Sequence, residues 1–308
     1  MNKRLINVIK KVKFYLAEPC CKVGFIIDNQ PTPVSITQLP YHNKIRWISN
    51  PKDGWYADPF ILDEDDGTIT LLVEHFSYHT QIGVLDKVIV NKNTWKVTTT
   101  KKILDCDTHL SFPNILRIGD EIYVYPENSQ SNTLTIYRYD IGTDSLVEPK
   151  VLVNEALLDS CIELIDGKYY IFATKQSEDT IYSDKNVLIY RSQNLFGPYL
   201  LVQEYQYPKP YGRSAGSFLF EDGKIIRPSQ NGDGGYGLEV IFSEVSMTDE
   251  IFSFSELKRI GPRKISRWAG IHTYNVFSKV VVVDGISYRR GLITALFMKL
   301  YNSLKRKK

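Results

Sequence analysis

A hairpin pattern that recurs along the middle of the chain constrains its fold more than any other feature of the sequence. In each copy an apolar run leads into a turn that contains glycine, and a second apolar run follows directly. Asp-Gly between apolar runs is a strong hairpin signal, because glycine supplies the positive φ that a tight turn requires. Helical periodicity is almost absent between about residues 55 and 290, so we expect strands there. The expected turns lie at Gly67, Asp120, Gly167, Gly223 and Gly285.

The spacing of these turns indicates how many units the fold contains. Successive turns, counted from position 67 to position 285, are separated by 53, 47, 56 and 62 residues. Each interval holds a second hairpin-like stretch, such as residues 84–97 and 134–146. Four strands in a repeat of about 50 residues are typical of a propeller blade. We therefore predict an all-β fold, a five-bladed β-propeller over residues 21–290. Seven blades of roughly 40–45 residues would need the whole chain, and their Gly-His and Trp-Asp signatures are absent.

The composition agrees with a folded domain and excludes several classes of protein. With 43% hydrophobic and 24% charged residues, the chain of 308 residues is not mainly disordered and can bury a sizeable core. A net charge of +3 argues against nucleic-acid binding. The 20 tyrosines and 14 phenylalanines favour strands. The four cysteines show neither a disulfide framework nor metal-ligand spacing, so we expect reduced thiols, no metal and no cofactor.

The two ends of the chain differ from its middle. Residues 1–20 and 291–308 carry apolar side chains at helical spacing among lysines and arginines, so we expect a basic amphipathic segment at each end. Such helices either lie in an anionic membrane interface or pack on the propeller. Lysines at positions 10, 11 and 13 interrupt any signal-peptide core, and no apolar run approaches the length of a membrane span. We therefore expect a cytoplasmic protein, with peripheral contact with the inner face of the membrane as one of these two alternatives.

Pairing within the hairpins predicts which polar side chains meet. In an antiparallel hairpin the start of the first strand lies beside the end of the second. Seven residues beyond the first four turns stand Glu74, Glu127, Thr174 and Gln230. The strand starts opposite them hold Asp58, Ser111, Asp159 and the pair Arg213-Ser214, and His272 precedes the first strand of the fifth repeat. If these hairpins are the innermost of each blade, all of these side chains meet at one mouth of the central channel.

The expected mouth of the channel combines carboxylates with cations. Its carboxylates are Asp58, Glu74, Glu127 and Asp159, and its cations are Lys175, Arg213, Arg227 and His272. Carboxylates gathered in a cleft are the usual means of acid–base chemistry on sugars, although polar strand ends also occur simply because they meet water. The cations suit an anionic group such as a sugar-nucleotide diphosphate or a phospholipid-linked acceptor, or else they balance the carboxylates in ion pairs.

Other side chains carry weaker signals. His75, His79 and His109 could suggest a metal site, but a spacing of four residues brings ligands onto one face of a helix, and this stretch follows a strand. The glycine-rich residues 231–237 do not join a strand to a helix as a phosphate-binding loop does, so we expect a loop beside the mouth. Several aromatic side chains could either stack on sugar rings or pack in the core. They are Trp55, Tyr56, Tyr236, Trp268 and Tyr274.

Several motifs, taken as a set, resemble those of a known family. The stretch Trp55-Tyr56-Ala57-Asp58-Pro59-Phe60 is similar to the first-blade Asp-Pro motif of five-bladed furanosidase-type glycoside hydrolases, the clan of arabinanases and β-xylosidases. Over about residues 20–288 the chain more specifically resembles the N-terminal propeller of glucosamine inositolphosphorylceramide transferases and its free-standing bacterial relatives. The matching stretches are residues 23–27, 57–60, 109–113, 125–128, 167–174, 227–230, 236–237 and 270–275. In plant members a separate glycosyltransferase domain follows the propeller.

The resemblance implies roles for individual residues. It makes Asp58 the general base and Glu127 the acid or a sugar-binding partner, and Asp159 is the third expected catalytic carboxylate. The flanks of Glu127 and Asp159 do not match the hydrolase patterns closely. Arg213 and Arg227 would hold an anionic donor group. The expected substrate-binding residues are Trp55, Tyr56, Glu74, His109, Lys175, Arg213, Arg227, Gln230, Tyr236, His272 and Asn275.

These observations lead to one favoured function and two alternatives. We expect a carbohydrate-active propeller, a glycosyltransferase-like enzyme or accessory in bacterial surface-polysaccharide or glycolipid assembly, in which Asp58 deprotonates an acceptor hydroxyl. Its expected partners are a carbohydrate, a sugar nucleotide or a lipid-linked glycan, an anionic membrane surface, and no nucleic acid. The alternatives are a glycoside hydrolase of the furanosidase type, which would release free sugar, and a non-catalytic glycan-binding module, which would bind without turnover.

Overall fold

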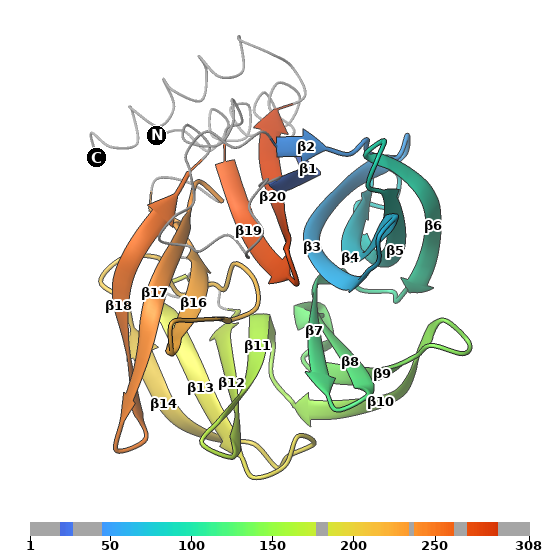
Figure 1. Ribbon diagram of the computed structural model, residues 1–308. Helices are drawn as coiled ribbons and strands as arrows, with labels where there is room; N and C mark the ends of the chain where they lie inside the picture. Colours follow the sequence, from blue (N-terminus) through green and yellow to red (C-terminus); the bar gives the residue numbers. More distant parts are fainter. Residues whose placement is uncertain (1–18, 27–44, 177–183, 234–236, 262–269, 289–308) are drawn as a thin grey trace, which may run out of the picture.

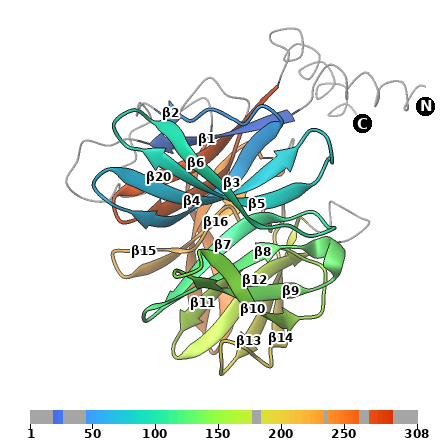
Figure 2. The same cartoon turned by 90° about the vertical axis from the view of Figure 1, so that its right-hand side faces the viewer.

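The chain forms five four-stranded antiparallel sheets that are arranged around one axis (Figures 1 and 2). The computed structural model describes residues 19–26, 45–176, 184–233, 237–261 and 270–288. The predicted all-β, five-bladed propeller is therefore confirmed. The expected tail helices lie outside these residues, except that Pro19 and Cys20 belong to a strand. In the described part of the chain, no helix is long and apolar enough to cross a bilayer.

Four of the blades are built from consecutive strands. Blade 1 contains β3 (Gly54–Glu64), β4 (Thr68–Ser77), β5 (Gly83–Asn91) and β6 (Lys96–Leu104). Blade 2 contains β7 (Ser111–Ile118), β8 (Glu121–Glu127), β9 (Leu134–Asp140) and β10 (Ser145–Val153), with the short 3₁₀ turn Ser129–Ser131 between β8 and β9. Blade 3 contains β11 (Leu157–Ile165), β12 (Lys168–Lys175), β13 (Asn186–Ser192) and β14 (Leu200–Gln206). Blade 4 contains β15 (Leu219–Glu221), β16 (Lys224–Gln230), β17 (Val240–Thr248) and β18 (Ile251–Ile260).

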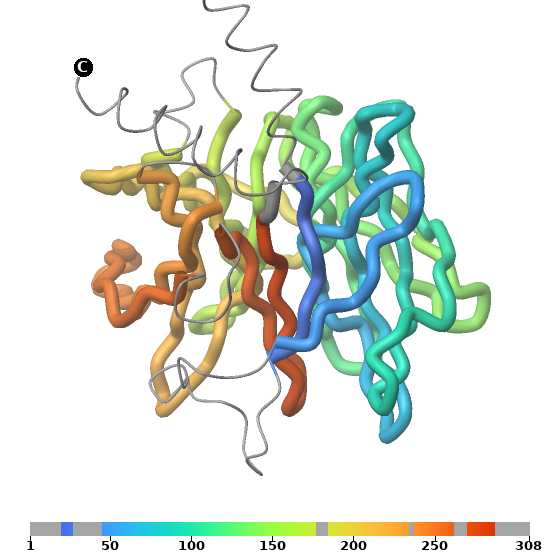
Figure 3. Tube along the Cα trace, turned by 90° about the horizontal axis from the view of Figure 1, so that it is seen from above, coloured from blue at the N-terminus to red at the C-terminus, as the bar shows by residue number. Residues whose placement is uncertain are grey.

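Blade 5 is built from both ends of the described chain. Its strands are β19 (Gly270–Phe277), β20 (Val280–Tyr288), β1 (Pro19–Ile26) and β2 (Ile45–Trp47), in that order. β1 pairs antiparallel with β20 along its whole length, from Pro19 opposite Tyr288 to Ile26 opposite Val281. Figure 3 shows this blue strand beside the red strands β19 and β20. The early strand therefore closes the ring of blades, as in a barrel whose first and last strands pair.

The first four predicted hairpins are confirmed. Their strands pair antiparallel. In blades 1, 2 and 3 the strands that lie nearest the propeller axis are β3, β7 and β11 (Figure 1). In blades 3 and 4 the turns Asp166-Gly167 and Asp222-Gly223 have positive φ at both residues. Two successive residues with positive φ define the type I′ turn, whose twist matches that of the flanking strands. The Asp-Gly pairs in these blades therefore form the tight turns that they predicted, because both residues adopt the positive φ that such turns require.

The predicted fifth turn is wrong. Asp284 and Gly285 lie inside β20, and the hairpin turns instead at Ser278 and Lys279, where Phe277 pairs with Val280. Ser278 takes the positive φ, +52°, that the tight turn needs. A serine in this conformation gives no signal in the sequence, whereas Asp-Gly gives a strong one. This correction places Asp284 in the middle of a buried strand.

Neighbouring blades pack through their apolar faces, so the hydrophobic core lies between blades rather than at the axis. Aromatic pairs bridge three of these boundaries, in edge-on geometries that such rings prefer. The pairs are Phe60–Phe112, Phe172–Phe252 and Phe242–Tyr274, with ring centroids 4.9, 5.1 and 5.0 Å apart. Because apolar packing is satisfied between the sheets, the innermost strands can present polar side chains to the axis.

Candidate active site

A β-bulge at the same place in four innermost strands determines what faces the axis. In β3, β7, β11 and β19 two residues lie opposite one residue of the next strand. The first bulge residues are Asp58, Phe112, Asp159 and His272. The first three have φ values of +46°, +44° and +45°, which are rare for residues other than glycine. A bulge re-aims a side chain and leaves a backbone N–H without its ladder partner.

Carboxylates of the preceding blade accept hydrogen bonds from these backbone N–H groups. Asp284 Oδ2 accepts from Asp58 N at 3.1 Å, and Asp58 Oδ2 accepts from Phe112 N at 3.2 Å. Glu127 Oε2 accepts from Asp159 N, also at 3.2 Å. These contacts join blade 5 to blade 1, blade 1 to blade 2, and blade 2 to blade 3. The carboxylates are therefore structural acceptors as well as candidate reactive groups.

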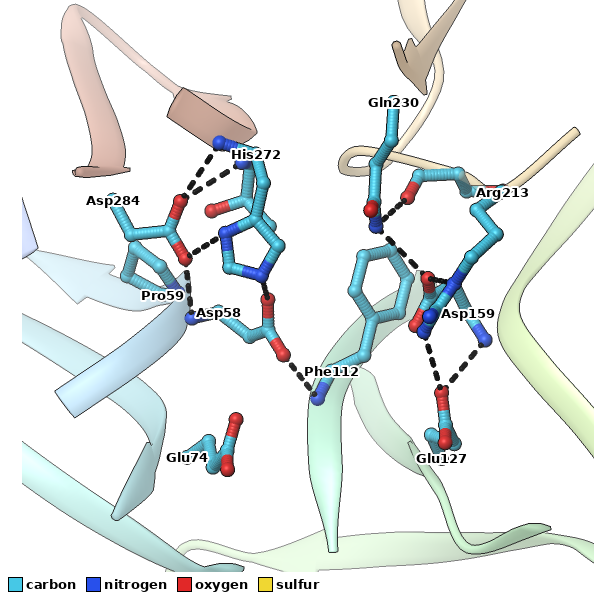
Figure 4. Close-up of polar contacts among 12 residues, drawn as sticks. Asp58, Pro59, Glu74, Phe112, Glu127, Asp159, Arg213, Gln230, His272 and Asp284 are labelled. Carbon is cyan, nitrogen blue, oxygen red and sulfur yellow. Dashed lines mark hydrogen bonds and ion pairs between the residues drawn. The ribbon is translucent and has the colours of Figure 1, made fainter. Parts of the chain in front are cut away.

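The polar side chains at the axis form one group, which we call the axial cluster (Figure 4). Its members are Asp58, Glu74, Glu127, Asp159, Arg213, Gln230, His272 and Asp284. Seven of these eight were expected from the sequence, and the structure brings them together. In the close-up, contacts on Asp58 and contacts on Asp159 form two halves, with Phe112 between them. Most members are buried, but Arg213 keeps 22% of its side chain exposed.

One half of the cluster is organised by Arg213. Its Nε lies 2.8 Å from Asp159 Oδ2, and its terminal nitrogen lies 3.5 Å from Glu127 Oε2. Gln230 Nε2 donates to the same Asp159 oxygen at 2.9 Å. The guanidinium thus pairs with two carboxylates at once, so it orients them and offsets their charge. These contacts agree with the alternative in which the cations at the mouth balance the carboxylates in ion pairs.

The other half is organised by His272. Its Nδ1 lies 2.7 Å from Asp284 Oδ2, and its Nε2 lies 3.3 Å from Asp58 Oδ1. Burial lowers the pKa of His272, but the two carboxylates more than reverse this and raise it to about 9. One atom from each of these residues lies within 4.8 Å of the others, a grouping that could hold a metal ion. The imidazole already pairs with both carboxylates, however, so these residues fit a chain of ion pairs better than a set of metal ligands.

Glu74 lies at the edge of the cluster beside His109. The backbone N–H of Gly83 donates to His109 Nδ1 at 2.9 Å, so that nitrogen carries no proton. The ring is therefore neutral, in agreement with a pKa that burial and Arg213 lower. His109 Nε2 lies 3.5 Å from Glu74 Oε1, which is buried and accepts no hydrogen bond among the described residues. Glu74 therefore keeps a carboxyl oxygen whose hydrogen-bonding capacity is unused among the described residues.

Burial raises the pKa of three axial carboxyl groups. For Asp58, burial outweighs the opposing effect of His272, and the pKa rises to about 7. For Glu74, burial and the neighbouring carboxylates place the pKa well above its ordinary value. For Glu127, burial and a neighbouring carboxylate do the same, against the lowering effect of Arg213. Near neutral pH the cluster thus holds both groups that can give a proton and a group poised to take one.

A second polar layer adjoins the cluster along the innermost strands. Asn275 Nδ2 donates to Pro59 O at 2.9 Å, and its Oδ1 accepts from Ser217 N at 2.9 Å. Ser217 Oγ donates to Asn114 Oδ1, and Asn114 Nδ2 donates to Ser160 O at 3.2 Å. These contacts link residues of all five blades. Asn275, expected to bind substrate, has both ends of its amide engaged in joining blades.

Two expected cations do not reach the axial cluster. Arg227 is fully buried within blade 4, where its guanidinium donates to Gly212 O and to Ser214 Oγ. Lys175 pairs with Glu155, and half of its side chain is exposed. Both were expected at the mouth because they stand near predicted strand ends, and position along a strand does not determine which face a side chain takes. Neither is positioned to hold an anionic group at the axis.

The expected aromatic residues are also separated by the structure. Tyr56 is buried inside blade 1, where its hydroxyl lies 3.3 Å from Thr100 Oγ1. Trp55 points to the other face of the strand and stacks on Phe76, with ring centroids 4.6 Å apart. Trp55 is partly exposed and can still contact a ligand. Tyr236 lies outside the described residues.

Asp284 is the member of the cluster that sequence reasoning missed. It occupies the position opposite the bulge in blade 5, where the other bulged blades have Val73, Pro126 and Ala173. Its carboxylate is fully buried. The sequence assigned it to a turn because Gly285 follows it. A signal was nevertheless present, since the apolar alternation continues beyond Gly285.

Comparison with known proteins shows one family. A family model described as "Glucosamine inositolphosphorylceramide transferase 1, N-terminal" matches residues 46–275. Similar proteins include glucosamine inositolphosphorylceramide transferase 1 from Oryza sativa subsp. japonica, 28% identical over 212 residues, and from Arabidopsis thaliana, 27% identical over 210 residues. These matches cover 65% and 66% of this chain but 28% and 26% of those proteins. The chain thus corresponds to about a quarter of the length of these relatives.

Solved structures share the fold at low identity. An exo-β-1,3-galactanase from Phanerochaete chrysosporium, in complex with β-1,3-galactotriose, matches with a TM-score of 0.51 and 11% identity, over 68% of this chain and 51% of that one. A β-xylosidase/α-arabinofuranosidase from a compost metagenome, in complex with xylotriose, matches with a TM-score of 0.54 and 12% identity, over 78% and 93%. At such identities the likeness establishes the propeller architecture alone.

Proposed function

The chain belongs to the glucosamine inositolphosphorylceramide transferase 1 N-terminal family, and we propose that it is a carbohydrate-active propeller whose axial cluster binds a glycan and acts on it. One observation carries the proposal: Asp58 and Glu127 converge on the axis from two blades, and both carboxyl groups have raised pKa values. Two carboxyl groups whose pKa values are raised by burial are the equipment of acid–base chemistry at a glycosidic bond. The names of the relatives, which are transferases, support transfer to an acceptor as the favoured reaction.

In the proposed reaction Asp58 is the base and Glu127 the acid. Asp58 takes the proton of an acceptor hydroxyl while that oxygen forms a bond to the anomeric carbon. Glu127 gives its proton to the departing oxygen as the old carbon–oxygen bond breaks. When the acceptor is a sugar or lipid hydroxyl the outcome is transfer, and when it is water the outcome is hydrolysis. Asp159 and Arg213 orient Glu127, in keeping with their contacts.

The charges of the cluster favour a neutral sugar ring at the axis. Arg213 already pairs with two carboxylates, and Arg227 and Lys175 lie elsewhere. The carboxyl oxygen of Glu74 can accept a hydrogen bond from a sugar hydroxyl. A face for sugar stacking lies further out, where Trp55 stacks on Phe76. An anionic donor group, if the substrate has one, would therefore bind away from the axis.

We place this activity in bacterial surface-polysaccharide or glycolipid assembly, on the cytoplasmic side of the membrane. The basic amphipathic sequences at residues 1–20 and 291–308 support contact with anionic lipid. Sedimentation with vesicles that contain a tenth to a third of anionic lipid should carry the full chain down at low salt. A chain limited to residues 19–288 should stay in solution. Equal behaviour of the two chains would refute the membrane role without touching the proposed chemistry.

A substrate screen tests the chemistry. Purified protein is incubated with sugar nucleotides, lipid-linked acceptors and aryl furanosides, and products are read by mass spectrometry. Asp58→Asn and Glu127→Gln should each lower turnover by at least 100-fold, because each removes one of the proton-transfer groups. Asp86→Asn is the matched control, since Asp86 is a buried carboxyl of blade 1 that pairs with His75 away from the axis.

The products decide among the alternatives. Transfer by the wild type that both axial variants lose supports the proposal. Free sugar from aryl glycosides would identify a hydrolase with the same acid–base pair. Glycan binding without product, weakened by both axial variants, would identify a binding module. Turnover that survives Asp58→Asn would show that the base is another group.

A further inference from the structure

The Asp284 carboxylate uses both of its oxygens to hold two blades in register. Oδ1 accepts from the backbone N–H groups of His272 and Thr273, at 3.3 and 2.9 Å. Oδ2 accepts from Asp58 N at 3.1 Å and lies 2.7 Å from His272 Nδ1. The residue is fully buried, so these donors take the place of water. One side chain therefore fixes the bulge of blade 5 and the bulge of blade 1 together.

His272 connects Asp284 to Asp58. Its two ring nitrogens face carboxylate oxygens, Nδ1 toward Asp284 and Nε2 toward Asp58 Oδ1 at 3.3 Å. Both nitrogens can donate only when the ring is an imidazolium. Only 3% of the His272 side chain is exposed, so no solvent competes for these contacts. The ring is held in one orientation by Asp284 at one end and presents an N–H to Asp58 at the other.

Asp58 is in turn held at both of its oxygens. Oδ1 faces His272 Nε2, and Oδ2 accepts from Phe112 N at 3.2 Å. The plane of the carboxylate is therefore set by one contact within its own half of the cluster and one from blade 2. Each oxygen keeps a second lone pair, which can take a proton from a substrate hydroxyl.

We infer that Asp284 is a positioning residue that acts through His272 to hold the Asp58 carboxylate toward the reacting hydroxyl. The inference rests on the proposed role of Asp58 as base. Asp284 does not touch substrate in this arrangement. Its effect is to fix the bulge backbone from which Asp58 projects and to keep the imidazolium between the two carboxylates. The other titratable groups around these three residues are Glu74, Asp159 and Cys21. Burial and the charges of Asp58 and Asp284 raise the pKa of Glu74 and of the Cys21 thiol, and burial together with the charge of Asp159 raises the pKa of Asp58.

The first test is a measurement on His272 that needs no substrate. Side-chain ¹⁵N spectra of histidine distinguish an imidazolium from the two neutral tautomers, and His272→Gln identifies the signal among the five histidines. In the wild type at neutral pH, His272 should be doubly protonated. In Asp284→Asn, which keeps the shape of the side chain, it should titrate to the neutral form at lower pH. Asp86→Asn should shift the signal of His75, its ion-pair partner, and leave His272 unchanged.

The second test uses turnover. Asp284→Asn should lower kcat on the order of 100-fold with little change in KM, since misplacement of a reacting group by about 1 Å has that effect. In the double variant Asp284→Asn/His272→Gln, kcat should fall by the same factor as in the less active of the two single variants and not by the product of the two factors. The reason is that both residues act on Asp58 by one route. Asp86→Asn should retain full turnover.

The outcomes separate this inference from the proposed function. A neutral His272 in the wild type at pH 7, or an unchanged His272 signal in Asp284→Asn, overturns the inference whatever the protein catalyses. If Asp284→Asn does not fold, the wild-type spectrum and the kinetics of His272→Gln decide alone. If the spectra agree but Asp58→Asn keeps full turnover, the chain of contacts exists and the assignment of Asp58 as base is the part that fails. Independent, multiplicative losses in the double variant would also overturn the route through His272.

Discussion

At the scale of single residues, buried carboxyl groups make the stability of this protein depend on pH. Glu74 holds its proton to a higher pH in the folded chain than in the unfolded chain, because burial disfavours its charged form. Unfolding therefore releases a proton above a pH of about 4.3, the ordinary value for glutamate, and stability falls as the pH rises. Asp58 acts in the same direction up to a pH of about 7. His272, whose pKa is raised to about 9, contributes stability below about pH 6.5 that is lost as the pH rises through 9.

Glu74→Gln should therefore stabilise the protein at alkaline pH and not in acid. The amide resembles the protonated carboxyl group, so at pH 4, below the ordinary glutamate pKa, the free energy of unfolding should change little. At pH 8 it should rise by roughly 1–3 kcal/mol, since each unit of pKa difference is worth about 1.4 kcal/mol. Urea unfolding at both pH values measures this. Glu121→Gln, at the exposed start of β8, should have no effect at either pH. A uniform change at both pH values would contradict the argument.

Much of the axial cluster could be predicted from the sequence at this scale. Counting seven residues from the turns at Gly67 and Asp120 located Glu74 and Glu127, because hairpin pairing has a fixed register. Position along the strand did not reveal which face a side chain takes, and Arg227 was misplaced for that reason. Asp284 was missed because its neighbour Gly285 resembles a turn. Both errors arose because a local sequence signal specifies a turn or a position along a strand, but not the pairing of that strand with its neighbours.

At the scale of elements, the innermost strands combine a bulge with a polar layer that locks neighbouring blades. The bulges were not predicted, since a bulge is an extra residue in a pairing that the sequence does not display. Four of the blades were predicted because their hairpins carry turn signals, and the fifth was counted from Asp284-Gly285, which lies inside β20. The contacts between blades were not predicted, because they join residues far apart in the chain. Asn275 is an example, as it bonds to Pro59 of blade 1 and Ser217 beside β15.

Asn275→Asp should destabilise the fold more than the loss of one hydrogen bond. The substitution removes the donor to Pro59 O and places a buried negative charge 2.9 Å from that carbonyl oxygen. The cost should be roughly 2–4 kcal/mol at pH 7 and smaller at pH 4, where the new carboxyl can be protonated. Asn91→Asp is the control, because only the oxygen of Asn91 is used, as an acceptor from Thr94 and Asn93. The free energy of unfolding is measured with urea. Equal losses of this free energy in the two variants would show that the Asn275 amide does not stabilise the contact between blades more than an ordinary turn amide stabilises its turn.

At the scale of the whole molecule, the ring of blades is closed by pairing β1 with β20. The closing strand comes from the start of the described chain, whereas each of the other four blades is built from consecutive strands. Gly24 of β1 marks how closely β2 approaches, since a Cβ there would lie 2.5 Å from side chains of Ile45 and Trp47. Without β1, β20 would expose an unpaired edge and β2 would lose its partner. Open edges of this kind favour aggregation.

A chain that starts at residue 45 should therefore lose cooperative unfolding, whereas one that starts at residue 19 should keep it. The decisive variant is a circular permutant. Because Pro19 pairs directly with Tyr288, an Asn-Gly turn can join residue 288 to residue 19, and residues 19–47 then follow the rest of the propeller. This permutant should regain the urea midpoint of the chain that starts at residue 19, since β1 closes the same blade from the other end of the sequence. If the shortened chain unfolds as cooperatively as the complete one, the closing strand does not stabilise the ring. If the permutant stays unfolded while the chain from residue 19 folds, closure depends on the order of the chain as well as on the pairing.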